Sequence, residues 1–293
     1  MHHTDHTPRW ADVWLTALPP VIWGTTYIVT SQLLPPDRPF TAALLRVLPA
    51  GLLLILATGW RPAPGHWLRL LILSALNIGA FQPLLFIAAY RLPGGLAAVV
   101  GACQPLLVMA LIWQCERRPP SRLALGASVL GVLGMAALLL SPGSHWDGPG
   151  MLAAAAGALL MACGTYLTRR WALPAPVSAL TGWQLLLGGL MLTPLVLHYD
   201  PPLPTLSSLQ IAAYLYLSSI GALLAYWLWF RGITRLSPVA VSSLGLLSPL
   251  TAVLLGWVLL GQALSPQSLL GMLTVLGSVL VVQRSMIAPA APR

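Results

Sequence analysis

The sequence contains no lysine and carries little charge of either sign. Only 7% of its 293 residues are charged, six Asp or Glu against fifteen arginines, whereas about a quarter of the residues in a soluble domain are charged. Hydrophobic residues make up 57% of the chain, and no stretch outside the apolar segments is long enough to form its own core. A nucleic-acid-binding protein needs a clustered basic face on a soluble domain, which is lacking here. The composition therefore excludes soluble enzymes and nucleic acid partners, and it indicates a membrane protein.

Reactive residues are scarce inside the apolar segments. No Asp, Glu or His falls deep in any of them, so a proton relay of carboxylates or imidazoles has no place in the membrane. Metal-ligand clusters and Ser/His pairs are missing at depth for the same reason. Without lysine the chain has no phosphate-binding loop of the form Gly-x-x-x-x-Gly-Lys-Ser/Thr. We therefore expect no catalytic residue, no metal site and no cofactor, and we favour facilitated diffusion, exchange or coupling through backbone oxygens over proton antiport.

Ten apolar runs follow one another along the chain, each about 20 residues long and so able to cross a bilayer. Breaks rich in Pro, Gly or Arg separate them. Their apolarity is continuous rather than alternating, which excludes a membrane β-barrel. The sequence predicts an all-α polytopic membrane protein with ten transmembrane helices. The expected spans are 13–33, 40–58, 67–90, 96–114, 123–140, 149–168, 177–198, 208–230, 238–260 and 267–283.

The arginines are distributed unevenly between alternate loops. With a cytoplasmic amino terminus, the cytoplasmic segments hold twelve of them and the outer loops hold two, Arg38 and Arg91, while Arg46 lies within the second span. Cytoplasmic loops of membrane proteins carry such an excess of basic residues. We therefore expect both termini in the cytoplasm and a multi-pass protein of the cytoplasmic (inner) membrane. The net charge of +9 then reflects topology and requires no acidic partner.

The two halves of the sequence resemble each other. Residues 101–106 of the fourth span, Gly-Ala-Cys-Gln-Pro-Leu, match residues 245–250 of the ninth, Gly-Leu-Leu-Ser-Pro-Leu, at an offset of 144 residues. The same offset relates Arg91 to Arg235, each followed by leucine. Further matches relate the first span to the sixth and the fifth to the tenth; they pair 23–27 with 163–166, and 125–131 with 270–277.

This internal repeat predicts how the chain is organised. Because each half has five spans, an odd number, the second half enters the membrane from the opposite side, so the two are inverted repeats. That geometry is a recurring basis of alternating access around a shared central site. The expected division is a cytoplasmic tail 1–12, a first five-helix repeat 13–140, a linker 141–148, a second, inverted five-helix repeat 149–283 and a cytoplasmic tail 284–293.

The motifs resemble those of a known transporter family. The five-plus-five layout, the Trp-Gly-Thr run at 23–25, the paired Gly-x-x-polar-Pro-Leu segments and the Gly-rich fifth and tenth spans resemble the EamA branch of the drug/metabolite transporter superfamily over nearly the whole chain. Within that branch the chain is most similar to the YddG-type aromatic amino acid exporters. The resemblance implies a basket of spans one to four and six to nine around a central cavity, with spans five and ten as scaffold. The branch often has an acid after each fourth-type span; Glu116 matches this in the first half, whereas Gln262 stands near the equivalent place in the second.

Polar and aromatic residues at mid-depth are the candidates for a substrate site, because polar groups that face lipid are costly. Each of the paired prolines removes an amide from its helix and is expected to free the carbonyl four residues earlier, an acceptor for a ligand ammonium. The alternative is that these groups only join helices or fill space. The candidate substrate-binding residues are Trp23, Tyr27, Asn77, Gln82, Gly101, Gln104, Pro105, Tyr166, Tyr226, Trp227, Ser243, Gly245, Ser248 and Pro249.

Arg46 is the only ionisable residue well inside a span. If it faces the cavity, its guanidinium can hold a substrate carboxylate through two parallel hydrogen bonds. Alternatively, it extends to the outer interface or bonds to carbonyls freed near Pro49. Its approximate partner in the second repeat is Gln184.

These observations predict a secondary transporter that exports amino acids, aromatic or neutral, and related small metabolites. Its partners would be a small-molecule substrate and membrane lipid, and it would be a monomer or a homodimer formed through the small residues of spans five and ten. Two other classes stay open. A lipid flippase or scramblase for a lipid-linked group would need a lateral polar groove, with Arg46 as a phosphate contact; a sensor or assembly subunit would bind without flux.

Overall fold

The computed structural model of the chain describes residues 10–92, 96–140 and 147–287, and every regular element in this part is a helix. Most of the expected linker 141–148 and most of both tails lie outside these residues. The elements are α1 (Trp10–Leu33), α2 (Pro39–Thr58), η1 (Pro64–His66), α3 (Trp67–Ser74), η2 (Ala75–Gly79), α4 (Phe81–Arg91), α5 (Leu96–Gly101), α6 (Gln104–Glu116), α7 (Arg122–Leu139), α8 (Gly148–Trp171), α9 (Val177–Tyr199), α10 (Ser208–Ser218), η3 (Ser219–Leu224), α11 (Ala225–Arg235), α12 (Pro238–Leu244), α13 (Leu247–Leu260) and α14 (Pro266–Ile287).

Nine helical segments in the described part of the chain are long and apolar enough to cross a membrane, which confirms a polytopic membrane protein. Several of them consist of two or three consecutive elements, such as Ser208–Arg235, which includes α10, η3 and α11. The one expected span that is not among these nine is the first, 13–33; it corresponds to α1, which has 24 residues but is less apolar than the nine. Its Pro19, Pro20 and Thr16 are buried against neighbouring helices rather than exposed.

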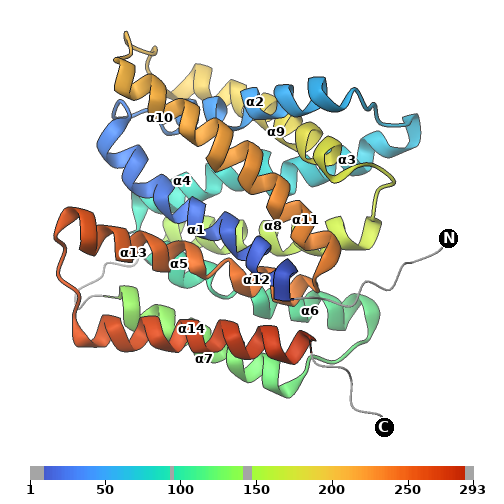
Figure 1. Cartoon of the computed structure of the whole chain (residues 1–293), viewed down its shortest axis with the longest axis vertical. Helices are drawn as coiled ribbons and strands as arrows, with labels where there is room; N and C mark the ends of the chain where they lie inside the picture. The colour runs from blue at the N-terminus through green and yellow to red at the C-terminus, as the bar shows by residue number, and fades with distance from the viewer. Residues whose placement is uncertain (1–9, 93–95, 141–146, 288–293) are drawn as a thin grey trace.

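The helices run alternately in opposite directions through one bundle (Figure 1). The beginning of α1 and the end of α14 lie at the same end of this bundle, at the right in Figure 1. We call this end the terminal face and the other end the opposite face. The terminal face therefore also holds the end of α11 and the beginning of α7, and the opposite face holds the end of α4 and the beginning of α8.

Both halves contain a widened helical turn at the same place. Residues Ala75–Gly79 of the third span and Ser219–Leu224 of the eighth form π-helical turns, and their first residues are separated by 144 positions, the offset of the sequence repeat. Such turns arise where one extra residue is accommodated inside an α-helix, and they expose backbone groups that a regular helix would cover. The structure thus repeats the relation seen in the sequence.

The fourth and ninth spans, expected as continuous helices over 96–114 and 238–260, are each broken beside the paired prolines. α5 ends at Gly101 and α6 begins at Gln104, while α12 ends at Leu244 and α13 begins at Leu247. Pro105 and Pro249 lie in the first turn of the helix that follows each break, where the missing amide costs no hydrogen bond.

Glycines bring the second and seventh spans into close contact. A Cβ atom on Gly51 of α2 would lie 2.9 Å from the carbonyl oxygen of Gly182 on α9, and one on Gly182 would lie 2.8 Å from Cβ of Leu54. The side chains around this crossing, including Val47 and Leu185, are fully buried. α7 and α14 form a second pair at the other side of the bundle (Figure 1) and pack on each other along their length.

Candidate functional site

Four aromatic side chains meet near the middle of the bundle. The ring of Trp23 on α1 lies 5.0 Å from that of Tyr226 and 5.2 Å from that of Trp229, between centroids, and Tyr226 stacks on Phe230 at 6.0 Å. The three α11 residues share one face of that helix because they are spaced by three and four positions, and all three are buried. Together these rings form an apolar wall suited to a flat or hydrophobic solute.

The carbonyl of Gly221 joins this wall to a positive charge. Its oxygen accepts a hydrogen bond from Nε1 of Trp23 at 3.1 Å and another from Nη2 of Arg46 at 3.0 Å. Gly221 lies within the π-helical turn η3, where the backbone ladder is widened, and it has no side chain to cover its carbonyl. The turn therefore supplies the acceptor that positions both side chains.

Arg46 is half-buried and has unused donor capacity. Its Nε atom is buried without a hydrogen-bond partner, and its guanidinium lies 5.9 Å from the ring centroid of Tyr226, in cation–π geometry. Tyr27 and Tyr216 also lie close enough to interact with it electrostatically. Arg46 forms no ion pair with any described residue. The arrangement is a cation that lacks an anion.

Tyr27 is poorly covered by the rest of the protein. Its side chain is 52% exposed although it comes from the same helix as Trp23, one turn further along. Two residues before it, Thr25 shares a hydrogen bond of 2.6 Å with the hydroxyl of Tyr216. α1 thus presents both an aromatic ring and hydroxyl groups to the surroundings of Arg46.

Gln82 and Tyr226, which occupy equivalent positions of the sequence repeat, are in contact. Nε2 of Gln82 donates to the hydroxyl of Tyr226 at 3.3 Å, and the two residues are 144 positions apart, the repeat offset. Residues at equivalent positions of two symmetric halves can touch only near the symmetry axis. The aromatic wall and Arg46 therefore lie where the two halves of the chain meet.

The broken fourth and ninth spans approach the same centre. Nε2 of Gln104 is buried without a partner, and its Oε1 lies 3.9 Å from where a Cβ on Gly245 would be, at the same distance from that point as the edge of Trp229. A Cβ on Gly101 would meet no atom within 4 Å, so the first break borders open space. Ser248, the repeat partner of Gln104, is half-buried.

One expectation about these breaks was wrong. The carbonyl of Gly245 is not free, because it accepts a hydrogen bond of 3.1 Å from the amide of Ser248 in a tighter turn. In the first repeat, no described backbone amide outside the helical ladders bonds to the carbonyl of Gly101. The two breaks are therefore equivalent in sequence but not in hydrogen bonding.

Other candidates lie away from this cluster. Asn77 is buried and donates to Gln184 at 2.8 Å and to Thr168 at 3.3 Å, so it joins three helices. Ser243 is equally buried, and its hydroxyl accepts a bond from Gln283 of α14 at 2.9 Å. These two residues act as the helix-joining groups that the sequence left as an alternative.

Two aromatic candidates are also placed elsewhere. Tyr166 is buried near the terminal face, where its hydroxyl accepts a bond from Arg170 and its ring lies below the same guanidinium. Trp227 is 37% exposed and points away from Tyr226 because consecutive helical residues differ by about 100°.

Sequence reasoning omitted Trp229, Phe230, Tyr216 and the Gly221 carbonyl as members of the site. Trp229 and Phe230 follow Tyr226 at helical spacing, a signal that could have added them. The role of Gly221 depends on the π-helical turn, which has no marker in the local sequence. Arg46 also differs from both alternatives given for it, because it donates to the Gly221 carbonyl and not to a carbonyl near Pro49 or to groups at the outer interface.

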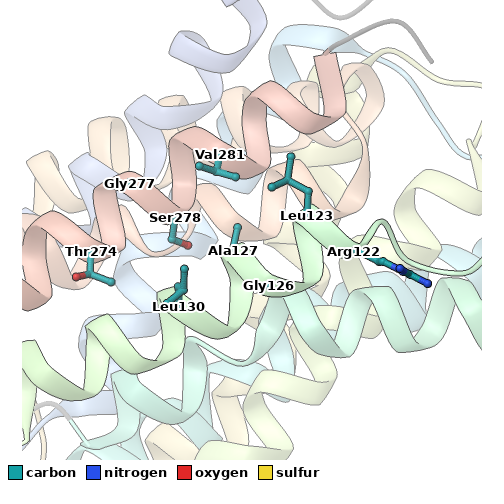
Figure 2. A pocket seen from close by; sticks show the side chains of 9 residues that line it. All are labelled: Arg122, Leu123, Gly126, Ala127, Leu130, Thr274, Gly277, Ser278 and Val281. Carbon is teal, nitrogen blue, oxygen red and sulfur yellow. The ribbon is translucent and has the colours of Figure 1, made fainter. Parts of the chain in front are cut away.

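Two surface clefts lie apart from this centre. A groove of about 600 Å³ runs between α7 and α14 in the half near the terminal face, where Figure 2 shows Gly126 and Ala127 opposite Gly277 and Ser278, with Arg122 at one end. A smaller cleft of about 310 Å³ opens at the opposite face; it is lined by Asp37, Pro39, Phe40, Phe86, Ile87, Arg91, Tyr199 and Asp200. Neither includes Arg46 or the aromatic wall.

Comparisons with known proteins relate the chain to membrane transporters. The model of a family described as EamA-like transporter family matches residues 10–140 and again residues 148–284. Protein PecM of Dickeya dadantii (strain 3937) is 45% identical over 267 residues, which cover 90% of this chain and 89% of that protein.

More distant proteins cover similar shares of the chain. The probable amino-acid metabolite efflux pump of Salmonella typhimurium is 28% identical over 92% of this chain and 94% of its own length. The uncharacterized inner membrane transporter YedA of Escherichia coli (strain K12) is 27% identical over 93% and 90%. A solved crystal structure, 20% identical in sequence, superposes with a TM-score of 0.76 over 93% of this chain and 98% of the other; it shows the same fold.

Proposed function

The chain belongs to the EamA-like transporter family, and we propose that it exports amino acids, aromatic or neutral, and related small metabolites by alternating access. It is a transporter of the inner membrane and not an enzyme. In this proposal α1 also crosses the membrane, as the first of ten spans. The two halves are inverted repeats with the boundaries expected from the sequence, and the arginine-rich terminal face is cytoplasmic.

The observation that carries the proposal is the unpaired guanidinium beside an aromatic wall. A cation held in a poorly solvated place without a counter-ion is costly, so a substrate that brings a carboxylate there is favoured. Nε of Arg46 is free to donate while Nη2 remains bound to Gly221. The rings of Trp23 and Tyr226 then contact the apolar body of the substrate.

The open break of the fourth span supplies a second polar contact. The carbonyl of Gly101 and the side chain of Gln104 border the centre, and a carbonyl is a suitable acceptor for an ammonium group. A carboxylate, an ammonium and an apolar side chain together describe an amino acid. The name of the Salmonella relative, a probable amino-acid metabolite efflux pump, supports the same class.

The lipid alternative has no matching observation. A flippase needs a lateral polar groove, whereas the groove between α7 and α14 is lined mainly by apolar and small side chains. α7 and α14 pack on each other, which agrees with a scaffold role within one monomer.

Counterflow in proteoliposomes tests the proposal. Vesicles loaded with unlabelled solute take up labelled tryptophan, phenylalanine or threonine only if the protein exchanges them; tryptamine, which lacks the carboxylate, is the matched compound. We expect uptake of tryptophan and little of tryptamine. Arg46→Gln, whose amide can still donate to Gly221, should weaken apparent tryptophan affinity about 10- to 100-fold, the equivalent of one charge-assisted hydrogen bond.

Arg38→Gln is the control, because this exposed arginine donates only to the backbone carbonyls of Pro36 and Pro202. Tryptophan counterflow that is equal in Arg46→Gln and wild-type protein would remove Arg46 from the site. Absence of counterflow for all three amino acids, with folded protein, would refute the substrate class.

A further inference from the structure

An ion-pair cluster ties the beginning of α1 to the end of α11 at the terminal face. Oδ1 of Asp12 lies 2.9 Å from Nη2 of Arg231 and 3.5 Å from Nη1 of Arg235. The Asp12 side chain is only 8% exposed and that of Arg231 only 21%. The hydroxyl of Thr16 donates to the Asp12 carbonyl at 2.6 Å, and a Cβ on Gly232 would collide with Thr16, so the two helices are in direct contact here.

A second ion pair ties the end of α4 to the beginning of α8 at the opposite face. Nη1 of Arg91 lies 3.7 Å from Oδ2 of Asp147. Both side chains, 54% exposed for Arg91 and 34% for Asp147, are more exposed than those of Asp12 and Arg231. Asp147 also caps α8 by accepting a bond of 2.7 Å from the amide of Gly150, and a Cβ on Gly150 would lie 2.9 Å from Arg91.

The two pairs join corresponding span ends in the two halves, although Asp12 and Asp147 are 135 rather than 144 positions apart. Arg91 and Arg235 are 144 positions apart and each ends the third span of its half, while Asp12 and Asp147 each stand at the start of the first span of a half. Each pair therefore joins the first span of one half to the third span of the other half. At the terminal face α1 of the first half is joined to α11 of the second, and at the opposite face α8 of the second half is joined to α4 of the first. Inversion of the repeat places one pair at each face of the membrane.

The pairs differ in strength in a way that the geometry explains. The pair at the terminal face is shorter, better buried and doubled by Arg231, whose repeat equivalent at the opposite face is Ile87. An exposed pair at 3.7 Å is worth about 0–1 kcal/mol, whereas removing one partner of a buried pair leaves an uncompensated charge. In this conformation the terminal face is held more firmly than the opposite face.

We propose that these two ion pairs are the alternating gates of the transporter: Asp12 with Arg231 and Arg235 closes the terminal face, and Arg91 with Asp147 closes the opposite face. The proposal rests on the alternating access proposed above and adds the groups that set its balance. In the other conformation the side chains of Arg91 and Asp147 come within hydrogen-bond distance and are shielded from water, while α1 and α11 separate and Asp12 becomes hydrated.

Access to the centre tests the gates without any substrate. The probe is Gly101→Cys, placed where a side chain meets no other atom, in a chain whose Cys103, Cys115 and Cys163 are replaced by alanine. A membrane-impermeant maleimide is applied from one face or the other, with right-side-out and inside-out vesicles. The ratio of the two labelling rates reports which face is open.

The same substitution at the two equivalent positions should act in opposite directions. Arg235→Gln leaves Asp12 paired with Arg231, so the protein stays folded, and it should raise the labelling ratio in favour of the terminal face about fivefold. Arg91→Gln should shift the ratio toward the opposite face by about two- to fivefold. Arg122→Gln and Arg38→Gln are the matched controls at the two faces, since neither arginine has an ion pair among the described residues, and they should leave the ratio unchanged.

Arg91→Lys keeps both the positive charge and the Asp147 cap of α8, and it should leave the ratio near its original value. The gates would be overturned if Arg235→Gln and Arg91→Gln shifted the labelling ratio in the same direction, or if neither variant shifted it. They would also be overturned if the cysteine at position 101 were not labelled from either face in any variant. Opposite shifts without amino acid counterflow would retain the gates and reject the substrate class. Amino acid counterflow without any shift of the labelling ratio would retain the substrate class and reject the gates.

Discussion

The close contact between α2 and α9 allows a sharp prediction about stability. Replacing Gly51 by alanine places a Cβ atom 2.9 Å from the Gly182 carbonyl oxygen and even closer to the backbone nitrogen of Leu186. Ordinary contacts between such atoms begin near 3.4 Å, and backbone atoms inside a helix cannot move aside alone. The two helices must therefore separate by at least 0.5 Å, to judge from these distances.

The magnitude follows from the two opposing effects of the substitution. Overpacking of this kind costs about 1–3 kcal/mol, and separation of the helices also weakens the contacts at Gly189, where a Cβ already would lie 3.0 Å from Leu48. Alanine has a higher helix propensity than glycine, by about 1 kcal/mol at most. We therefore expect Gly51→Ala to destabilise the protein by about 1–2 kcal/mol.

Gly126→Ala on α7 is the matched control. A Cβ at this position meets no atom within 4 Å, so only the propensity gain remains. Melting of the purified protein in detergent, followed by tryptophan fluorescence, compares the two. At about 2 °C per kcal/mol for a chain of this size, Gly51→Ala should melt about 4 °C or more below Gly126→Ala. A Gly51→Ala protein that melts as high as the control would refute the reasoning.

Three further substitutions test polar contacts inside the bundle. Asn77→Leu leaves the buried Oε1 of Gln184 without its donor, which should lower the free energy of unfolding by about 1–3 kcal/mol. Adding Gln184→Leu should recover part of this loss in a melting experiment, and no recovery would contradict the pairing. Tyr226→Phe removes the acceptor of Gln82 but keeps the ring, so stability should fall by about 1 kcal/mol while cation–π stacking persists, and an unchanged melting temperature would argue against that bond. Trp23→Phe removes the donor to the π-helical carbonyl, which still accepts from an arginine; folding should change little, tryptophan counterflow should fall several-fold, and wild-type counterflow would exclude this side chain from the transport path.

The sequence was most informative where a residue type constrains the backbone by itself. Pro105 and Pro249 stood out in the sequence because a proline removes an amide from the helix ladder, and in the structure each lies directly after a break in its span. Continuous apolarity likewise predicted helices that cross a membrane, and nine were confirmed in the described ranges. α1 shows the limit of this signal, because its burial by neighbouring helices does not require high apolarity.

The sequence was less informative about which helices face each other. Helical spacing shows that Trp23 and Tyr27 share a face of one helix, but it does not identify the helix opposite. Tyr166 was grouped with them through the repeat, yet it packs against Arg170 near the terminal face. The carbonyl that binds Arg46 depends on a π-helical turn, whose formation is decided by tertiary packing rather than by local residue types.

The two π-helical turns serve different tasks. They begin 144 positions apart, in the third and eighth spans. One holds an asparagine that joins helices, and the other presents a bare carbonyl that holds an arginine. The same widening of a helix therefore supports packing in one half of the chain and a polar contact in the other.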